Sequence, residues 1–162
     1  MSRAAVLVQR VQEAGGHVDV RGDRVRVTAP AQLPQTLMVE LRAQKADIVR
    51  LFASAWVERY EERAAIMEHD GGLPRDQAET EAFDWCIIEW INLNPAISKS
   101  GRCAWCGKPE ADGSVIVPFG TGERGHAWLH HDCWPEWRRD IRGKAAQGLN
   151  TMGLDEPTGW RA

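Results

Sequence analysis

The sequence predicts an α+β fold made of three small units: a helix–hairpin–helix unit, a helical hairpin and a zinc-binding unit. Three observations support this prediction. Apolar residues change from helical to alternating spacing within residues 1–55, a broad helical apolar stripe follows within residues 56–98, and two pairs of metal-ligating residues lie within residues 99–150. We expect the remaining residues, 151–162, to form a flexible tail apart from Trp160.

The composition is that of an ordinary globular protein. The chain has 162 residues, of which 43% are hydrophobic and 27% charged, and its formal net charge is -3. A chain of this length buries enough surface to fold without disulfides, which argues against a largely disordered protein. No apolar run approaches the ~18 residues that cross a bilayer, and the run from Ala4 to Val8 is too short for a secretion signal. We therefore expect a cytoplasmic protein that does not bind membranes.

Residues 1–55 are predicted to contain two helical stretches. Leu7 and Val11 fall at helical spacing, and Gly15-Gly16 supplies residues that readily end a helix. A second stretch begins after Pro34, which suits the first turn of a helix. Its apolar stripe is interrupted near Lys45-Ala46. The stripe consists of Leu37, Leu41, Ile48, Leu51 and Phe52.

Between these helices, the sequence predicts a β-hairpin. Gly22-Asp23 is a two-residue turn that begins with Gly, as suits a tight hairpin. On either side of the turn, valines alternate with charged residues, so one face of the hairpin is apolar and the other is mostly basic. The apolar face consists of Val18, Val20, Val25 and Val27, and the basic face includes Arg21, Arg24 and Arg26.

The stretches LVQRVQEAGGHVDVRGDRVRVTAP and LMVELRAQKADIVRLF resemble the TubC-type N-terminal docking domain, a β-hairpin module found at the front of some nonribosomal peptide synthetase and hybrid megasynthase subunits. The resemblance covers residues 1–55. It implies that the hairpin edge receives a short segment from a partner protein and that basic side chains, here Arg21, Arg24 and Arg26, help to hold it. The chain also looks like small uncharacterised proteins of bacterial phages and mobile elements.

Residues 56–98 are predicted to form an acidic, antiparallel helical hairpin. One helix runs from Val57 to Met67, and the next begins at Leu73-Pro74 and ends before Pro95. The second helix is apolar on two adjacent faces, which predicts that it is covered on both sides. Its Cys86 is expected to be buried and inert. The unit carries 10 acidic and 3 basic side chains, which we interpret as a solvated surface.

The third unit carries the clearest chemistry. Cys103-Ala-Trp-Cys106-Gly107 is a CxxCG motif, and His130-His131-Asp132-Cys133 supplies a second pair of ligands. Zn²⁺ takes four nitrogen or sulfur ligands in a tetrahedron, and two such pairs complete that shell. We predict one structural zinc site formed by Cys103, Cys106, His130 and Cys133. His131 is the main alternative to His130, and His126 is a more distant one.

The elements around these ligands resemble the treble-clef group of zinc fingers. Ser114 to Phe119 and His126 to Leu129 are predicted strands, joined by a Gly120-Thr-Gly122 loop. A helix follows Cys133, with Pro135 in its first turn. In a treble clef, a short loop with the first ligand pair, called the knuckle, is followed by a hairpin and a helix. The CxxCG motif, the predicted strands and the predicted helix follow this order. We interpret Trp128, Trp134 and Trp137 as its core.

Treble clefs include the HNH nucleases, and His130-His131-Asp132 invites comparison with them. Such an enzyme needs a separate catalytic metal, a general-base His on the hairpin and an Asn or His on the following helix. Residues 134–147 contain neither Asn nor His, and His130 is assigned to zinc. We therefore predict that the protein is not an enzyme.

A nucleic-acid interaction is a second hypothesis for the zinc unit. Basic residues on the outward side of its helix could contact phosphates, and Trp105 and Trp128 could stack on bases. The basic residues are Arg138, Arg139, Arg142 and Lys144.

The leading hypothesis is a non-catalytic adaptor that docks a short peptide segment of a partner protein on its N-terminal hairpin and uses one Zn²⁺ for structure. The alternatives are a nucleic-acid-binding accessory protein of a phage or mobile element, and an HNH-like nuclease. If Arg21, Arg24 and Arg26 form only a solvated face, the hairpin merely caps the two neighbouring helices.

Overall fold

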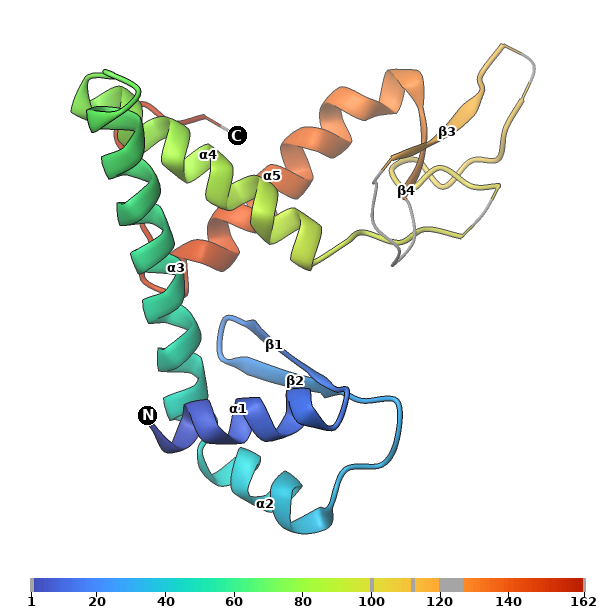
Figure 1. Cartoon of the computed structure of the whole chain (residues 1–162). Coiled ribbons are helices and arrows are strands. Elements are labelled where there is room, and N and C mark those ends of the chain that lie inside the picture. The colour runs from blue at the N-terminus through green and yellow to red at the C-terminus, as the bar shows by residue number, and fades with distance from the viewer. Residues whose placement is uncertain (1, 100, 112, 120–126, 162) are drawn as a thin grey trace.

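The computed structural model describes residues 2–99, 101–111, 113–119 and 127–161, and these residues form a mixed α+β fold. Within those ranges the chain has five α-helices and two antiparallel sheets of two strands each. The β1–β2 hairpin lies beside the first half of α3, and the β3–β4 hairpin lies at the start of α5 (Figure 1). In the same ranges, every helix is too short or too polar to span a bilayer.

The N-terminal unit has the predicted order of helix, hairpin and helix. Helix α1 (Arg3–Glu13) begins after Ser2, whose hydroxyl accepts a hydrogen bond from the backbone N–H of Ala5 at 3.2 Å. This contact satisfies one of the donors left free at a helix start. Strands β1 (His17–Arg21) and β2 (Arg24–Thr28) follow.

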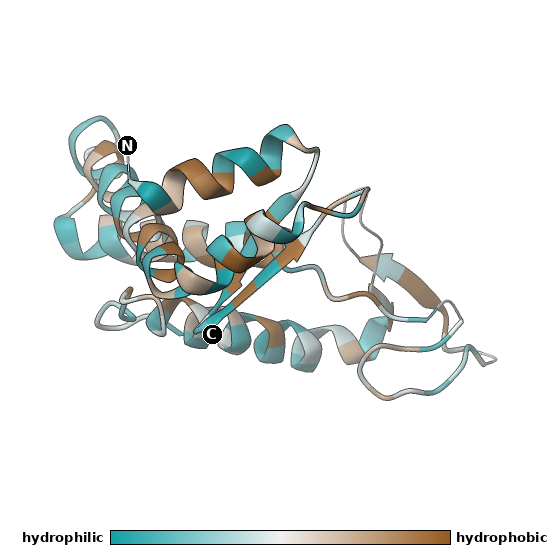
Figure 2. Ribbon diagram, turned by 90° about the horizontal axis from the view of Figure 1, so that it is seen from below, coloured by the Kyte–Doolittle hydropathy of each residue, from teal (hydrophilic) through white to brown (hydrophobic). Residues whose placement is uncertain are grey.

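Strands β1 and β2 pair in the register that the alternation predicts. Val18 lies opposite Val27, Val20 lies opposite Val25, and the turn begins at Gly22 with a φ of 58°. Val18 and Val20 are buried in the main core. Figure 2 shows the alternation of apolar and polar residues along the strands. The valine face therefore anchors the hairpin to the helices.

Helices α2 (Gln35–Ala43) and α3 (Lys45–His69) are separated at Gln44, next to the predicted interruption at Lys45-Ala46. Helix α3 has 25 residues and continues without a break through position 55. The boundary predicted between residues 1–55 and 56–98 thus lies inside one helix. Ile48 and Trp56, on either side of it, are buried in the same cluster, so both segments contribute to one core.

Helix α4 (Arg75–Leu93) follows Pro74, returns along α3 and also packs against α5 (Trp134–Asn150). This double contact explains the two apolar faces of α4. Cys86 is fully buried between its neighbours, and burial raises the pKa of its thiol to about 12. The prediction that Cys86 is buried is confirmed, and its thiol stays protonated at neutral pH.

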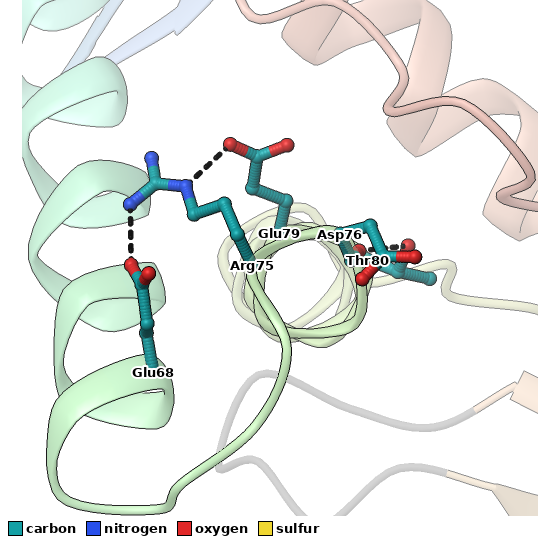
Figure 3. A network of polar contacts seen from close by, with 5 residues as sticks. All are labelled: Glu68, Arg75, Asp76, Glu79 and Thr80. Carbon is teal, nitrogen blue, oxygen red and sulfur yellow. Dashed lines mark hydrogen bonds and ion pairs between the residues drawn. The ribbon is translucent and has the colours of Figure 1, made fainter.

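One exposed arginine joins the two arms of the helical hairpin (Figure 3). Arg75 donates a hydrogen bond to Glu68 on α3 at 3.0 Å and another to Glu79, one turn further along α4, at 2.6 Å. These two carboxylates raise the pKa of Arg75 above its already high value. The side chain of Thr80 donates to the carbonyl of Asp76 at 2.9 Å in the same turn. The contacts of Arg75 thus link the end of α3 to the start of α4.

The main core continues past the end of α5. Met152 and Leu154 are each 4% exposed and belong to the cluster that α1, β1, α2, α3 and α4 share with α5. Trp160 packs edge-to-face against Phe83, with ring centroids 5.0 Å apart. The expectation of a flexible tail over residues 151–162 is therefore wrong at Met152 and Leu154, because the segment supplies these apolar side chains to the core.

A second, smaller apolar cluster lies around the predicted metal ligands. Strands β3 (Ile116–Phe119) and β4 (Ala127–His130) pair antiparallel and lead through the 3₁₀ turn η1 (His131–Cys133) into α5. Cys103, Ala127 and Leu129 are buried here. The predicted Gly120-Thr-Gly122 loop lies outside the described residues.

Candidate metal centre

Four side chains from the two sequence motifs converge. Cys103, Cys106, His130 and Cys133 bring their ligand atoms within 4.8 Å of one another. Sγ of Cys106 lies 3.4 Å from Nδ1 of His130, and Sγ of Cys133 lies 3.9 Å from the same atom. A tetrahedral zinc ion, with Zn–S of about 2.3 Å and Zn–N of about 2.0 Å, holds such atoms about 3.5 Å apart. The four residues, hereafter the metal cluster, could therefore hold a metal ion, and their geometry is compatible with zinc.

The first ligand pair lies on a tight loop. The backbone N–H of Cys103 donates to the carbonyl of Lys108 at 2.9 Å, and that of Gly107 donates to the carbonyl of Cys103 at 3.0 Å. Gly107 has a φ of 72°, a left-handed conformation that glycine adopts without steric cost. The glycine of the CxxCG motif thus turns the chain back after Cys106, which keeps the two thiols on one side of the loop.

His130 reaches the cluster from the end of β4, and its second ring nitrogen is also occupied. Nε2 of His130 lies 3.3 Å from the carbonyl oxygen of Pro109. A carbonyl only accepts hydrogen bonds, so this contact favours a proton on Nε2 and leaves the lone pair of Nδ1 for a metal. Nδ1 is the atom that faces Cys106 and Cys133.

Without a bound cation, deprotonation of all three thiols is energetically unfavourable. Burial acts to raise the pKa of Cys103, but hydrogen bonds from the backbone at Cys106 and His130 outweigh it and lower that pKa to about 6. Burial, together with the side chains of Cys103 and Cys106, raises the pKa of Cys133 to about 12. A divalent cation would remove this conflict, because it binds all three sulfurs as thiolates. Three thiolates and one imidazole form a ligand set that suits zinc.

Aromatic side chains hold the second ligand pair in place. The ring of Trp134, which follows Cys133 directly, stacks on Phe119 of β3 at a centroid distance of 4.0 Å. Trp137 stacks on Trp134 at 5.4 Å. Both tryptophans pack against the buried cluster around Cys103, as predicted. Trp128 is half-buried. Its backbone N–H donates to the hydroxyl of Ser98, and its carbonyl accepts from the N–H of Ala104, so β4 is bonded to the segment that carries the first ligand pair.

Of the two histidines considered as alternatives, only His131 lies within the described residues, and it does not belong to the metal cluster. The side chain of His131 is 98% exposed and lies beside Asp132 at 3.5 Å, so it points away from the thiols. His126 lies outside the described residues. The structure therefore brings His130, and not its neighbour His131, to the three cysteines.

The basic residues of α5 divide into two groups. Arg138 and Arg139 are exposed, as expected for a phosphate-binding surface, and Lys144 is exposed but paired with Asp140 at 2.6 Å. Arg142 was expected on the outward side of the helix, and this expectation is wrong. Its side chain is 10% exposed and donates to Asp84 of α4 at 2.6 Å, because α5 turns this position toward α4.

The basic face of the β1–β2 hairpin is at the surface. Arg21, Arg24 and Arg26 are all exposed. Arg21 lies directly opposite Arg24, and Arg26 lies opposite Asp19. Asp19 forms an ion pair with Arg21 at 3.1 Å. The hairpin thus presents three guanidinium groups and one carboxylate on one face.

No family model, curated protein or solved structure matches the chain. The likeness to TubC-type docking domains and to treble clefs therefore rests on the residues quoted above.

Sequence reasoning missed the supporting contacts of the site. The carbonyl of Pro109 near His130 and the hydroxyl of Ser98, which accepts from the N–H of Trp128 at 2.7 Å, have no motif of their own. The link from Asp84 to Arg142 and Trp160 spans three distant segments. The only sequence signal for this link is a single charged residue on an otherwise apolar face of each helix, Asp84 on α4 and Arg142 on α5.

Proposed function

We propose that the protein is a non-catalytic adaptor that docks a segment of a partner protein on its β1–β2 hairpin and holds one structural Zn²⁺ in the metal cluster. The observation that supports docking is the cross-strand pair of Arg21 and Arg24, with Arg26 on the same face. Like charges directly opposite each other destabilise a hairpin. Asp19 neutralises one of the three arginines, so an acidic segment would find a net positive face.

The backbone of the hairpin supports the same proposal. Its sheet contains β1 and β2 alone within the described residues, so the outer strand edges offer N–H and C=O groups to an added strand. Main-chain hydrogen bonds would supply affinity, and the arginines would select an acidic sequence. The valine face stays in the core, so docking requires no unfolding of the hairpin.

Titration with matched peptides tests the docking proposal. The probe is a fluorescent 12-residue peptide in which Glu alternates with Val or Thr, and its control carries Gln at each Glu. We expect the acidic peptide to bind with a Kd on the order of micromolar that weakens as salt rises, and the Gln peptide to bind far more weakly. The double variant Arg24→Glu, Arg26→Glu should lose binding.

The matched control carries the same charge change elsewhere. Arg138→Glu with Arg139→Glu reverses two exposed arginines on α5 and should leave peptide binding unchanged. If the acidic and the Gln peptide bind equally, or if both double variants bind like the unaltered protein, the arginine face does not dock a partner.

The role proposed for zinc follows from the number of protein ligands. Four side chains complete a tetrahedral shell and leave no position for water or substrate, as in structural rather than catalytic zinc sites. Incubation of the zinc-loaded protein with plasmid or single-stranded DNA and Mg²⁺ or Mn²⁺ should therefore leave the DNA intact. Cleavage that disappears in His131→Ala would instead support the nuclease alternative.

Nucleic-acid binding by the zinc unit is a second candidate, and one observation favours it. Trp105, in the middle of the CxxC loop, is 46% exposed, which leaves its indole accessible to a base. Arg138 and Arg139 are exposed on α5, whereas Arg142 is buried and unavailable. Electrophoretic retention of single-stranded DNA that weakens with salt and is lost in Trp105→Ala would support this function.

A further inference from the structure

A mainly apolar cavity of about 330 Å³ lies between β1 and helices α1, α3 and α4. Its walls include Val8 of α1, Val18 of β1, Phe52 and Trp56 of α3, and Trp90 of α4. In Figure 1 the hairpin lies beside the first half of α3, and the C-terminal end of α4 lies above the hairpin. The volume is at the lower end of the range of small-molecule sites, which are typically about 300–1,000 Å³.

A single buried amide lines this cavity at the end of α4. Asn94 is 6% exposed, and its Nδ2 donates to the carbonyl of Trp90 at 2.8 Å. Its Oδ1 is buried and accepts no hydrogen bond from any residue that the structure describes. A buried acceptor without a donor is uncommon and unfavourable in a folded protein. Because χ2 of Asn is a soft torsion, rotation of this amide can bring Oδ1 to a donor in the cavity, and Nδ2 then leaves the carbonyl of Trp90.

The charged residues that line the cavity already have partners. Asp19 pairs with Arg21 at 3.1 Å, and Arg59 pairs with Glu89 at 3.5 Å and lies 5.3 Å from the ring centroid of Trp56. The site therefore presents little net charge to an occupant. Mainly apolar walls, with Oδ1 of Asn94 as a buried acceptor that lacks a donor, favour an uncharged ligand that carries one donor.

We propose that this cavity binds a small, uncharged aromatic compound with a single N–H or O–H group, which donates to Oδ1 of Asn94. The site goes beyond the proposed docking function. The cavity is built largely by α3 and α4, and its lining includes Asp19 of the arginine face but neither Arg24 nor Arg26.

Indole and indene test this proposal as a matched pair of probes. Indene has the same fused-ring shape but a CH₂ group in place of the N–H. Each is titrated into the zinc-loaded full-length protein and followed by ¹H–¹⁵N NMR. We expect indole to bind with a Kd on the order of 0.1–1 mM. Its resonance shifts should centre on Val18, Trp56, Trp90 and the side-chain amide of Asn94. Indene should bind about five- to tenfold more weakly, because it cannot donate.

Two variants on one helix separate the cavity from the rest of the surface. Ala55 lines the cavity, whereas its neighbour Ser54 is exposed and does not. Ala55→Phe should fill the cavity and abolish indole binding, and Ser54→Phe should leave binding unchanged. If Ala55→Phe does not fold, Asn94→Leu provides the second test, since it should make indole and indene bind equally.

The proposal is overturned if indole causes no shifts at the cavity, or if indole and indene bind the unaltered protein equally well. It is also overturned if folded Ala55→Phe retains indole binding. None of these outcomes bears on docking, because the acidic-peptide titration with the Arg24→Glu, Arg26→Glu variant is a separate measurement.

Discussion

His130 and Pro109 are linked through the ring nitrogen of His130 that does not face the thiols. Nε2 of His130 lies 3.3 Å from the carbonyl oxygen of Pro109, while Nδ1 faces Cys106 and Cys133. The chain segment just after the knuckle therefore orients the histidine of the second ligand pair. This contact distinguishes His130 from the adjacent, exposed His131.

The first prediction concerns these two histidines. His130→Ala should lower the zinc affinity by at least tenfold, because it removes one of four ligands, whereas His131→Ala should bind zinc like the unaltered protein. His130→Cys should retain zinc, since four thiolates also suit the ion. Competition with a chromophoric chelator measures all three affinities. Loss of zinc in His131→Ala with retention in His130→Ala would reverse the ligand assignment.

The second prediction concerns the extent of unfolding when a ligand is removed. In Cys103→Ser, hydrogen exchange should increase strongly over residues 101–111, 113–119 and 127–134, the described part of the chain around the small cluster at the metal site. Protection should persist at Ala145, Ala146 and Leu149, because this end of α5 is buried in the main core. Hydrogen exchange with mass spectrometry measures both regions. Uniform loss of protection through α5 would show that the two clusters unfold together.

The third prediction concerns the ion pair between Arg142 and Asp84. Asp84→Ala should destabilise the protein by about 2 to 3 kcal/mol, because it leaves a buried guanidinium without its carboxylate. Arg142→Met should cost less, since the remaining Asp84 is 46% exposed and can be hydrated. Urea unfolding measures both variants. Arg138→Ala, an exposed control on α5, should change stability by less than about 0.5 kcal/mol.

The fourth prediction compares two glycines of α5. A Cβ at Gly148 would lie 2.8 Å from the indole of Trp90, whereas a Cβ at Gly143 would meet nothing within 4 Å. Gly148→Ala should therefore destabilise the protein by about 1 to 3 kcal/mol through overpacking. Gly143→Ala should stabilise it by about 0.5 to 1 kcal/mol through the higher helix propensity of Ala. Equal effects in thermal unfolding would contradict the close packing of α4 on α5.

Local patterns in the sequence predicted several of the elements. The alternation of Val18 and Val20 with charged residues predicted the register of the hairpin. The CxxCG motif and the His130–Cys133 pair together predicted which side chains meet in the metal cluster. The outward position expected for Arg142 failed because its orientation depends on Asp84, which is 58 residues away.

Local sequence patterns also failed to predict how far the core extends along the chain. The segment after α5 is short and polar, so it was expected to be flexible. Met152 and Leu154 nevertheless complete a core built from six other elements. Likewise, the change in composition after residue 55 did not mark a structural boundary, because α3 continues through it.

The central claim is that one zinc ion, held by the metal cluster, stabilises the residues around it. The zinc content of the purified protein tests this claim most directly. Elemental analysis should find about one zinc per chain in the unaltered protein and none in Cys133→Ser. Removal of zinc from the unaltered protein by a chelator should expose residues 101–134 to hydrogen exchange. A protein that contains no zinc, yet keeps these residues protected, would contradict the account.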